Sequence, residues 1–367
     1  MAANGTWLPT TSLEVFSPTY DDYYSDNSEG QENEAQKQAL LRSMHVLTMV
    51  IYSIAFVLGV TGNGLVIFVT GFRMKRTVNT VWFLNLAVAD FIFTFFLPFS
   101  VAYTALGFHW PFGLSLCKIN SGLAFLNLYA SVYLLMVISI DRCISVVLPV
   151  WAQNHRTPRL ALLVALAVWV VALAMCSPNF YFRHTAPSPF NKNIINCYNN
   201  FDTAQKGATK EERYRVMNLN HRAMIITRFV LGFLIPFSVI VGCYSAILIR
   251  LRRNHLAQSS KPFKVIAAVI VTFFLCWFPY HVFSFLEMNR SSSLETALII
   301  GLPLTSSLAF INSCLNPILY VFMGQDFKEK LRRSLFSAFE TAFTEEAANT
   351  TTNTKSKSTL EMDSNAM

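Results

Sequence analysis

The segment that decides the fold is Asn312-Ser-Cys-Leu-Asn316-Pro317-Ile-Leu-Tyr320, which lies within an uncharged stretch from Ala297 to Gln325. That stretch is long enough to cross the hydrocarbon core of a bilayer as a helix. Pro317 removes a backbone donor and kinks such a helix, and the amides of Asn312 and Asn316 need polar partners that lipid does not supply. An isolated Asn-Pro pair would indicate only a kink. Together with the polar residues of six other apolar windows, the segment predicts a membrane helix that faces a polar interior.

Composition places the whole chain in the membrane class. It is 53% hydrophobic and contains 32 phenylalanines, which is too apolar for an ordinary soluble protein. Windows with few or no charges, each of about the length needed to cross a bilayer, occur at 44–71, 79–106, 114–140, 160–182, 223–249, 265–286 and 297–324. The predicted fold is an all-α membrane protein, a bundle of seven transmembrane helices followed by a short amphipathic eighth helix.

Lysine and arginine gather in the loops after the first, third, fifth and seventh windows, and these loops contain almost no acid. The positive-inside rule makes that face cytoplasmic, so we expect a multi-pass plasma-membrane protein with its N-terminus outside and its C-terminus inside. Most of the net charge of +8 belongs to these loops. The charge therefore indicates a lipid bilayer as the surrounding partner and no nucleic acid.

The two ends of the chain differ in kind. Residues 14–34 hold seven acidic residues and no basic one, which is typical of disorder. This segment is either a solvated tether or an acidic arm that binds a basic partner. Sequons at Asn4 and Asn289 predict glycosylation on the outer side. The C-terminal tail is rich in Ser and Thr and resembles a kinase substrate whose phosphates could recruit a basic partner. The predicted divisions are an extracellular disordered acidic N-terminus at 1–42, the seven-transmembrane domain at 43–324, the amphipathic helix at 325–340 and the cytoplasmic Ser/Thr-rich tail at 341–367.

Seven cysteines divide by the side of the membrane on which they fall. Only Cys117, at the outer start of the third window, and Cys197, in the loop between the fourth and fifth, are expected at the oxidising face. The sequence therefore predicts a disulfide between them that fastens this loop across the mouth of the bundle.

Polar side chains within the windows are the next candidates for function. One carboxylate with several neutral oxygen donors suits a small hard cation such as sodium. The alternative is a network of water around a protonated Asp90, and no other cofactor is expected. The predicted sodium ligands are Asp90, Asn127, Ser131, Asn312 and Asn316.

The inner ends of the windows and the middle of the sixth suggest a conformational switch. Asp141 and Arg142 are adjacent on a helix, so they do not face each other squarely, and Arg142 is free to meet a partner. A bulky ring beside a proline in Trp277-Phe-Pro279 indicates a hinge, although such residues are usually core and kink. The full predicted switch comprises Asp141, Arg142, Tyr244, Phe273, Trp277, Pro279, Pro317 and Tyr320.

These motifs carry a resemblance. Gly62-Asn63, Leu86-Ala-Val-Ala-Asp90, Asp141-Arg142-Cys143, Cys276-Trp-Phe-Pro279 and Asn316-Pro-Ile-Leu-Tyr320 follow the pattern of rhodopsin-like G-protein-coupled receptors. Within that class the chain resembles the chemoattractant group, above all the chemerin receptors. The resemblance implies a receptor and not an enzyme. It also implies an extracellular peptide or small-protein chemoattractant or adipokine as ligand. The implied partners inside the cell are an inhibitory G protein and, through the C-terminal tail, receptor kinases and arrestin.

The outer half of the bundle supplies the predicted ligand site. Two arginines in a recessed mouth favour an anion, and a guanidinium can grip a carboxylate with two hydrogen bonds. Arg183 has the alternative of reaching out to lipid phosphate. Formyl-peptide receptors, by resemblance, carry an aspartate at the position of Phe125, which counts against a formyl peptide here. The predicted ligand-binding residues are Phe125, Arg183, Arg228, Tyr280, His281 and Glu287.

Other functions remain as alternatives. The ligand could be an anaphylatoxin-like peptide, a formyl peptide or an acidic lipid mediator, and the chain could be a scavenging receptor that does not signal. A transporter would show an internal repeat, and a retinal-based light sensor would need a lysine in the last window; neither feature is present. Many receptors of this class clamp Arg142 with an acid where this chain has Ser259. Here Arg142 can pair only locally, which would allow a higher basal activity than in receptors that have the acid.

Overall fold

The computed structural model describes residues 28–189, 191–253, 261–289 and 294–323. The predicted amphipathic helix, the Ser/Thr-rich tail, Asn4 and Ser259 lie outside the described residues, as does the side chain of Tyr320. Within them the elements are α1 (Ser28–Phe68), η1 (Val69–Arg73), α2 (Val78–Phe95), α3 (Leu97–Ala105), α4 (Gly113–Val147), α5 (Pro149–His155), α6 (Pro158–Phe182), β1 (Arg183–Pro187), β2 (Ile195–Asn199), α7 (Lys210–Phe229), η2 (Val230–Leu234), α8 (Ile235–Arg253), α9 (Lys261–Met288) and α10 (Glu295–Met323).

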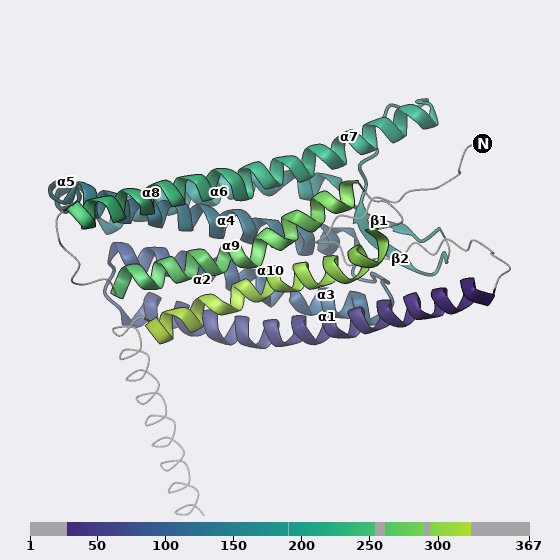
Figure 1. Ribbon diagram of the computed structural model, residues 1–367, viewed down its shortest axis with the longest axis horizontal. Helices are drawn as coiled ribbons and strands as arrows, with labels where there is room; N and C mark the ends of the chain where they lie inside the picture. Colours follow the sequence, from purple (N-terminus) through teal and green to yellow (C-terminus); the bar gives the residue numbers. More distant parts are fainter. Residues whose placement is uncertain (1–27, 190, 254–260, 290–293, 324–367) are drawn as a thin grey trace, which may run out of the picture.

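Helices long and apolar enough to cross a membrane lie side by side in one bundle (Figure 1). Among the described residues there are seven of these, at Gln36–Arg73, Val78–Ala105, Gly113–Val147, Pro158–Phe182, Lys210–Arg253, Ile270–Met288 and Glu295–Ile318. The hairpin of β1 and β2 lies at one end of the bundle and α5 at the other. The prediction of a seven-helix membrane bundle is confirmed.

α1 and α7 begin more than ten residues before their apolar windows. α1 already begins at Ser28, within the segment that composition predicts to be disordered, and Lys37 on it forms a 2.8 Å ion pair with Glu295 at the start of α10. α7 begins at Lys210 and projects from the bundle at the same end as the hairpin. A capping box starts it, because Thr209 Oγ1 accepts from the Glu212 N–H and Glu212 Oε2 accepts from the Thr209 N–H. Hydropathy does not reveal these polar turns outside the membrane.

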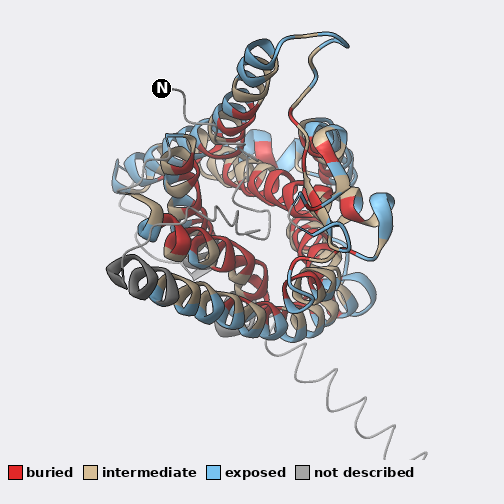
Figure 2. Cartoon of the chain, turned by 90° about the vertical axis from the view of Figure 1, so that its right-hand side faces the viewer, coloured by how far each residue is buried: buried red, intermediate tan, exposed pale blue. Residues whose placement is uncertain are grey.

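The core lies along the inward faces of the helices. Figure 2 shows buried residues lining the inside of the bundle and exposed ones covering its outside. α4 is the central helix, with 78% of its most apolar window buried, and it packs against α2, α6 and α8. In α6 only 28% of that window is buried, and leucines such as Leu163 and Leu166 point outward. An outer surface this apolar is suited to lipid rather than water.

Candidate functional site

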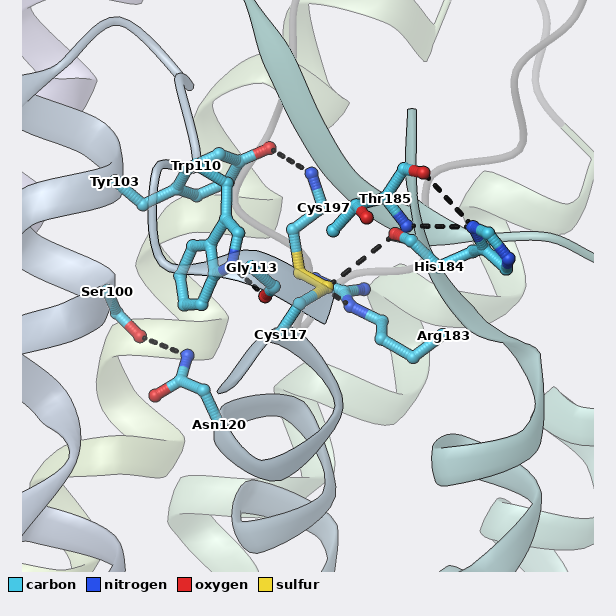
Figure 3. Close-up of a disulfide and its surroundings, with 10 residues drawn as sticks. All are labelled: Ser100, Tyr103, Trp110, Gly113, Cys117, Asn120, Arg183, His184, Thr185 and Cys197. Atoms are coloured by element: carbon cyan, nitrogen blue, oxygen red, sulfur yellow. Dashed lines mark hydrogen bonds between the residues drawn. A yellow bond between two sulfur atoms is a disulfide. The ribbon is translucent and has the colours of Figure 1, made fainter. Parts of the chain in front are cut away.

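The mouth of the bundle is built around the disulfide between Cys117 of α4 and Cys197 of β2 (Figure 3). β1 and β2 pair antiparallel, with Arg183 opposite Asn199. The Cys197 N–H donates to the hydroxyl of Tyr103, and Trp110 Nε1 donates to the carbonyl of Gly113. The structure thus contains the predicted disulfide, which fastens the hairpin to the outer end of α4.

Arg183 is the first residue of β1, and its side chain lies below the hairpin, inside the bundle. It is only 4% exposed, its Nε donates to the sulfur of Cys197 at 3.2 Å, and it lines a small cavity together with Ser100 and Asn120. The alternative in which Arg183 reaches out to lipid phosphate is therefore wrong: the strand that begins at Arg183 turns its side chain into the bundle.

Arg228 occupies a second position in the outer half, in the last turn of α7 and directly before the π-helical turn η2. It is 2% exposed, and its guanidinium carbon lies 4.0 Å from the ring centre of Phe125 on α4. Its Nη1 donates to the hydroxyl of Tyr280 on α9 at 2.5 Å, while its buried Nη2 has no hydrogen-bond partner in the part of the chain that the structure describes. α4, α7 and α9 thus enclose a cation that keeps one unused donor.

The remaining predicted ligand residues lie on α9. His281 is buried beside Tyr280 and packs on Phe229 and Phe233. Its Nε2 has no hydrogen-bond partner among the described residues. Glu287, two turns further out, is also buried. The structure therefore brings Arg228, Tyr280, His281 and Phe125 into one group, whereas Arg183 lies among other residues under the hairpin.

The predicted sodium ligands gather deep in the bundle. Asp90 is fully buried and accepts from Asn316 Nδ2 at 2.7 Å. In the amide orientation that satisfies its neighbours, Asn127 donates to Asp90 Oδ1 at 3.1 Å and to Ser131 Oγ at 3.2 Å, and accepts from Ser313 Oγ at 2.8 Å. The carbonyl oxygens of Asn312 and Asn316 are buried with no hydrogen-bond partner in the described chain. A carboxylate with unused neutral oxygens nearby fits a small hard cation.

At the opposite end the switch residues follow an arrangement that sequence alone did not predict. Asp141 pairs with Arg156, which follows α5, and not with its neighbour Arg142. Arg142 Nη2 donates to Oδ1 of Asn79 in the first turn of α2. Asn79 is therefore a residue that sequence reasoning missed. The sequence feature that could have pointed to Asn79 is its position between Thr77 and Thr80, the two threonines of the capping box that starts α2.

A column of rings links the outer group to the middle of the bundle. On α9, Tyr280 meets Trp277 edge-on at 5.6 Å between ring centres, and Trp277 meets Phe273 at 6.0 Å. Pro279 interrupts the hydrogen bonds of α9 within this column, and Pro317 does the same in α10. The predicted switch residues Phe273 and Trp277 therefore lie in one continuous row of ring contacts with Tyr280.

The fold and these motifs define a class of protein. The family model for the seven-transmembrane receptors of the rhodopsin family matches residues 62–320 of this chain. The chain belongs to that family, whose members are receptors and not enzymes.

Its relatives narrow the class further. The chain is 47% identical to chemerin-like receptor 1 of Homo sapiens over 83% of its own length and 82% of the relative's. It is 46% identical to chemerin-like receptor 1 of Sus scrofa, over 91% and 92% of the two lengths. It is 45% identical to N-formyl peptide receptor 3 of Homo sapiens, over 82% and 85%. The chain is thus a G-protein-coupled receptor of the chemerin-like and formyl peptide receptor type.

Proposed function

We propose that this receptor binds an extracellular peptide or small protein of chemerin type, with the ligand's C-terminal carboxylate against Arg228. The observation that carries the proposal is the buried guanidinium of Arg228, which is stacked on Phe125, bonded to Tyr280 and left with a free Nη2 donor. A carboxylate that reaches this donor gains a charge-assisted hydrogen bond in a desolvated site. Arg183 and Glu287 contribute the outer part of the pocket, and the acidic N-terminus makes the first contact.

The same proposal assigns the other end of the bundle to an inhibitory G protein and to arrestin. The lysines and arginines on that side support a cytoplasmic position by the positive-inside rule, and the proposal accordingly puts the hairpin on the extracellular side. Ligand pressure on the ring column displaces the inner part of α9, and Arg142 then engages the G protein. The names of the relatives support the ligand type, since they include chemerin-like and formyl peptide receptors.

A peptide panel tests this proposal. Cells that express the chain are exposed to synthetic peptides with the C-terminal sequences of chemerin and of an anaphylatoxin, each as free acid and as amide, and to a formyl peptide and an acidic lipid. We expect the free-acid chemerin peptide to lower cyclic nucleotide levels and its amide to be much weaker. A response to another ligand class alone would contradict the proposed ligand. Peptide uptake without any signal would identify a scavenging receptor instead.

We further propose that sodium binds beside Asp90 in the resting receptor, held by oxygens of Asn127, Ser131, Asn312 and Asn316. The expected result is that sodium weakens agonist binding in wild-type membranes and has no effect in Asp90→Asn, because the neutral amide lacks the charge that favours the ion. The measurement is peptide competition at equal ionic strength in sodium or in a large organic cation. Equal sodium sensitivity of the two proteins would rule the site out and favour the water network.

A further inference from the structure

Four polar side chains meet at the inner end of the bundle: Asn79 of α2, Asp141 and Arg142 of α4, and Arg156, which follows α5. Arg156 forms a fork on Asp141, with Nε 2.8 Å from Oδ1 and Nη2 3.0 Å from Oδ2. The same Nη2 donates to Oδ1 of Asn79 at 2.7 Å. Arg142 also donates to that amide oxygen. Two guanidinium groups thus share one neutral acceptor, while one of them holds the carboxylate.

The backbone fixes each member of this cluster. Asn79 lies in the first turn of α2, which a capping box of Thr77 and Thr80 closes. Arg156 ends α5, its N–H donates to the carbonyl of Ala152, and Thr157 after it caps α6. Asp141 belongs to α4, whose last turns α5 follows directly. The fork therefore joins a residue within α4 to the residue that caps the end of α5.

The fork changes what Arg142 can do. Asp141 is only 12% exposed, so it needs a cation, and adjacent residues on a helix face each other poorly. Arg156 supplies that cation. Among the described residues, the buried Nε of Arg142 has no hydrogen-bond partner, and neither has the buried hydroxyl of Tyr244 nearby on α8. Within the described residues, the Arg142 guanidinium is held by its hydrogen bond to the shared amide oxygen of Asn79.

We propose that Arg156 is a positioning residue that keeps Arg142 available to a G protein by occupying Asp141 in its place. This inference rests on the proposed coupling to a G protein. When Arg156 is removed, the nearest cation that Asp141 can recruit is Arg142, and a captured Arg142 is withdrawn from its partner. The inference also gives a structural reason to expect basal activity, because neither Asn79 nor Tyr244 binds Arg142 as strongly as a carboxylate would.

The test measures guanine-nucleotide exchange by a purified inhibitory G protein, with the receptor in lipid discs. It is run without agonist and with the free-acid chemerin peptide. We expect Arg156→Ala to lower basal exchange and peptide potency by roughly 3- to 10-fold, as for a partly exposed, charge-assisted pair. Arg156→Gln keeps a hydrogen-bond donor without the charge and is expected to show most of the same loss. It replaces the alanine variant in the test if that variant folds poorly. Arg159→Ala removes an exposed arginine three residues further on and is the matched control.

A second-site change separates positioning from direct contact. Asp141→Asn added to Arg156→Ala should restore exchange to the wild-type level or above, because a neutral amide cannot hold Arg142. Peptide binding in the absence of G protein should be equal in all variants. Exchange that stays low in the double variant, or an Arg156→Ala receptor that matches wild type, would overturn the inference and leave the proposed function intact. A wild-type receptor that drives no exchange would overturn both.

Discussion

Replacement of Arg228 by alanine is expected to reduce the potency of a free-acid peptide agonist by roughly 30-fold to several thousand-fold. Removing one partner of a desolvated, hydrogen-bonded charge pair costs about 2–5 kcal/mol, which corresponds to that range. Because Arg228 is buried and its Nη2 is unused, we expect a loss of this size and not the smaller loss that is typical of exposed ion pairs. Arg228→Lys should recover only part of the loss, because an ammonium cannot reproduce the planar fork.

The measurement is a two-by-two cycle of wild-type or Arg228→Ala receptor against free-acid or amidated peptide, with surface expression checked. The variant should matter much less for the amide, which has already lost the carboxylate. Arg222→Ala is the control, since Arg222 lies six residues further out on α7 with an exposed side chain. If the two losses simply add, Arg228 does not hold the carboxylate, and the buried Arg183 becomes the better candidate.

Loss of the disulfide is expected to be the second large effect. The bond closes a separation of 80 residues, for which the chain-entropy model gives about 4.5 kcal/mol. That figure is an upper limit, because helices that persist in the membrane already restrict the unfolded chain. The double variant Cys117→Ala/Cys197→Ala should therefore melt on the order of 5 °C lower. It should also lose most peptide binding, since the hairpin above Arg183 is released.

Thermal melting of the detergent-solubilised receptor with and without a reductant checks this expectation. Reductant should lower the melting temperature of the wild type to that of the double variant and leave the double variant unchanged. Cys243→Ser, which alters a half-buried free thiol, should retain both the wild-type melting temperature and its sensitivity to reductant. A double variant as stable as the wild type would show that the hairpin is held by its other contacts, such as the bond from Cys197 to Tyr103.

The sequence by itself determined the seven-helix bundle, the pairing of Cys117 with Cys197 and the polar interior around Asp90. The physical reason is that a bilayer imposes strict rules on composition. A span needs about 20 apolar residues, and a buried Asn or Asp must face other helices. Only two cysteines were expected at the outer face, which left one pairing. These features depend on residue type and spacing, so they can be read along the chain.

Only the tertiary structure decided which polar groups meet across helices. Arg183 could have turned to lipid or into the bundle, and the pairing of β1 with β2 settled its direction. Asp141 stands next to Arg142 in the sequence but pairs with Arg156, and Asn79 reaches both arginines from another helix. Such contacts depend on the rotation of each helix and on where its ends stop, and these are set by packing against neighbours far away in the sequence.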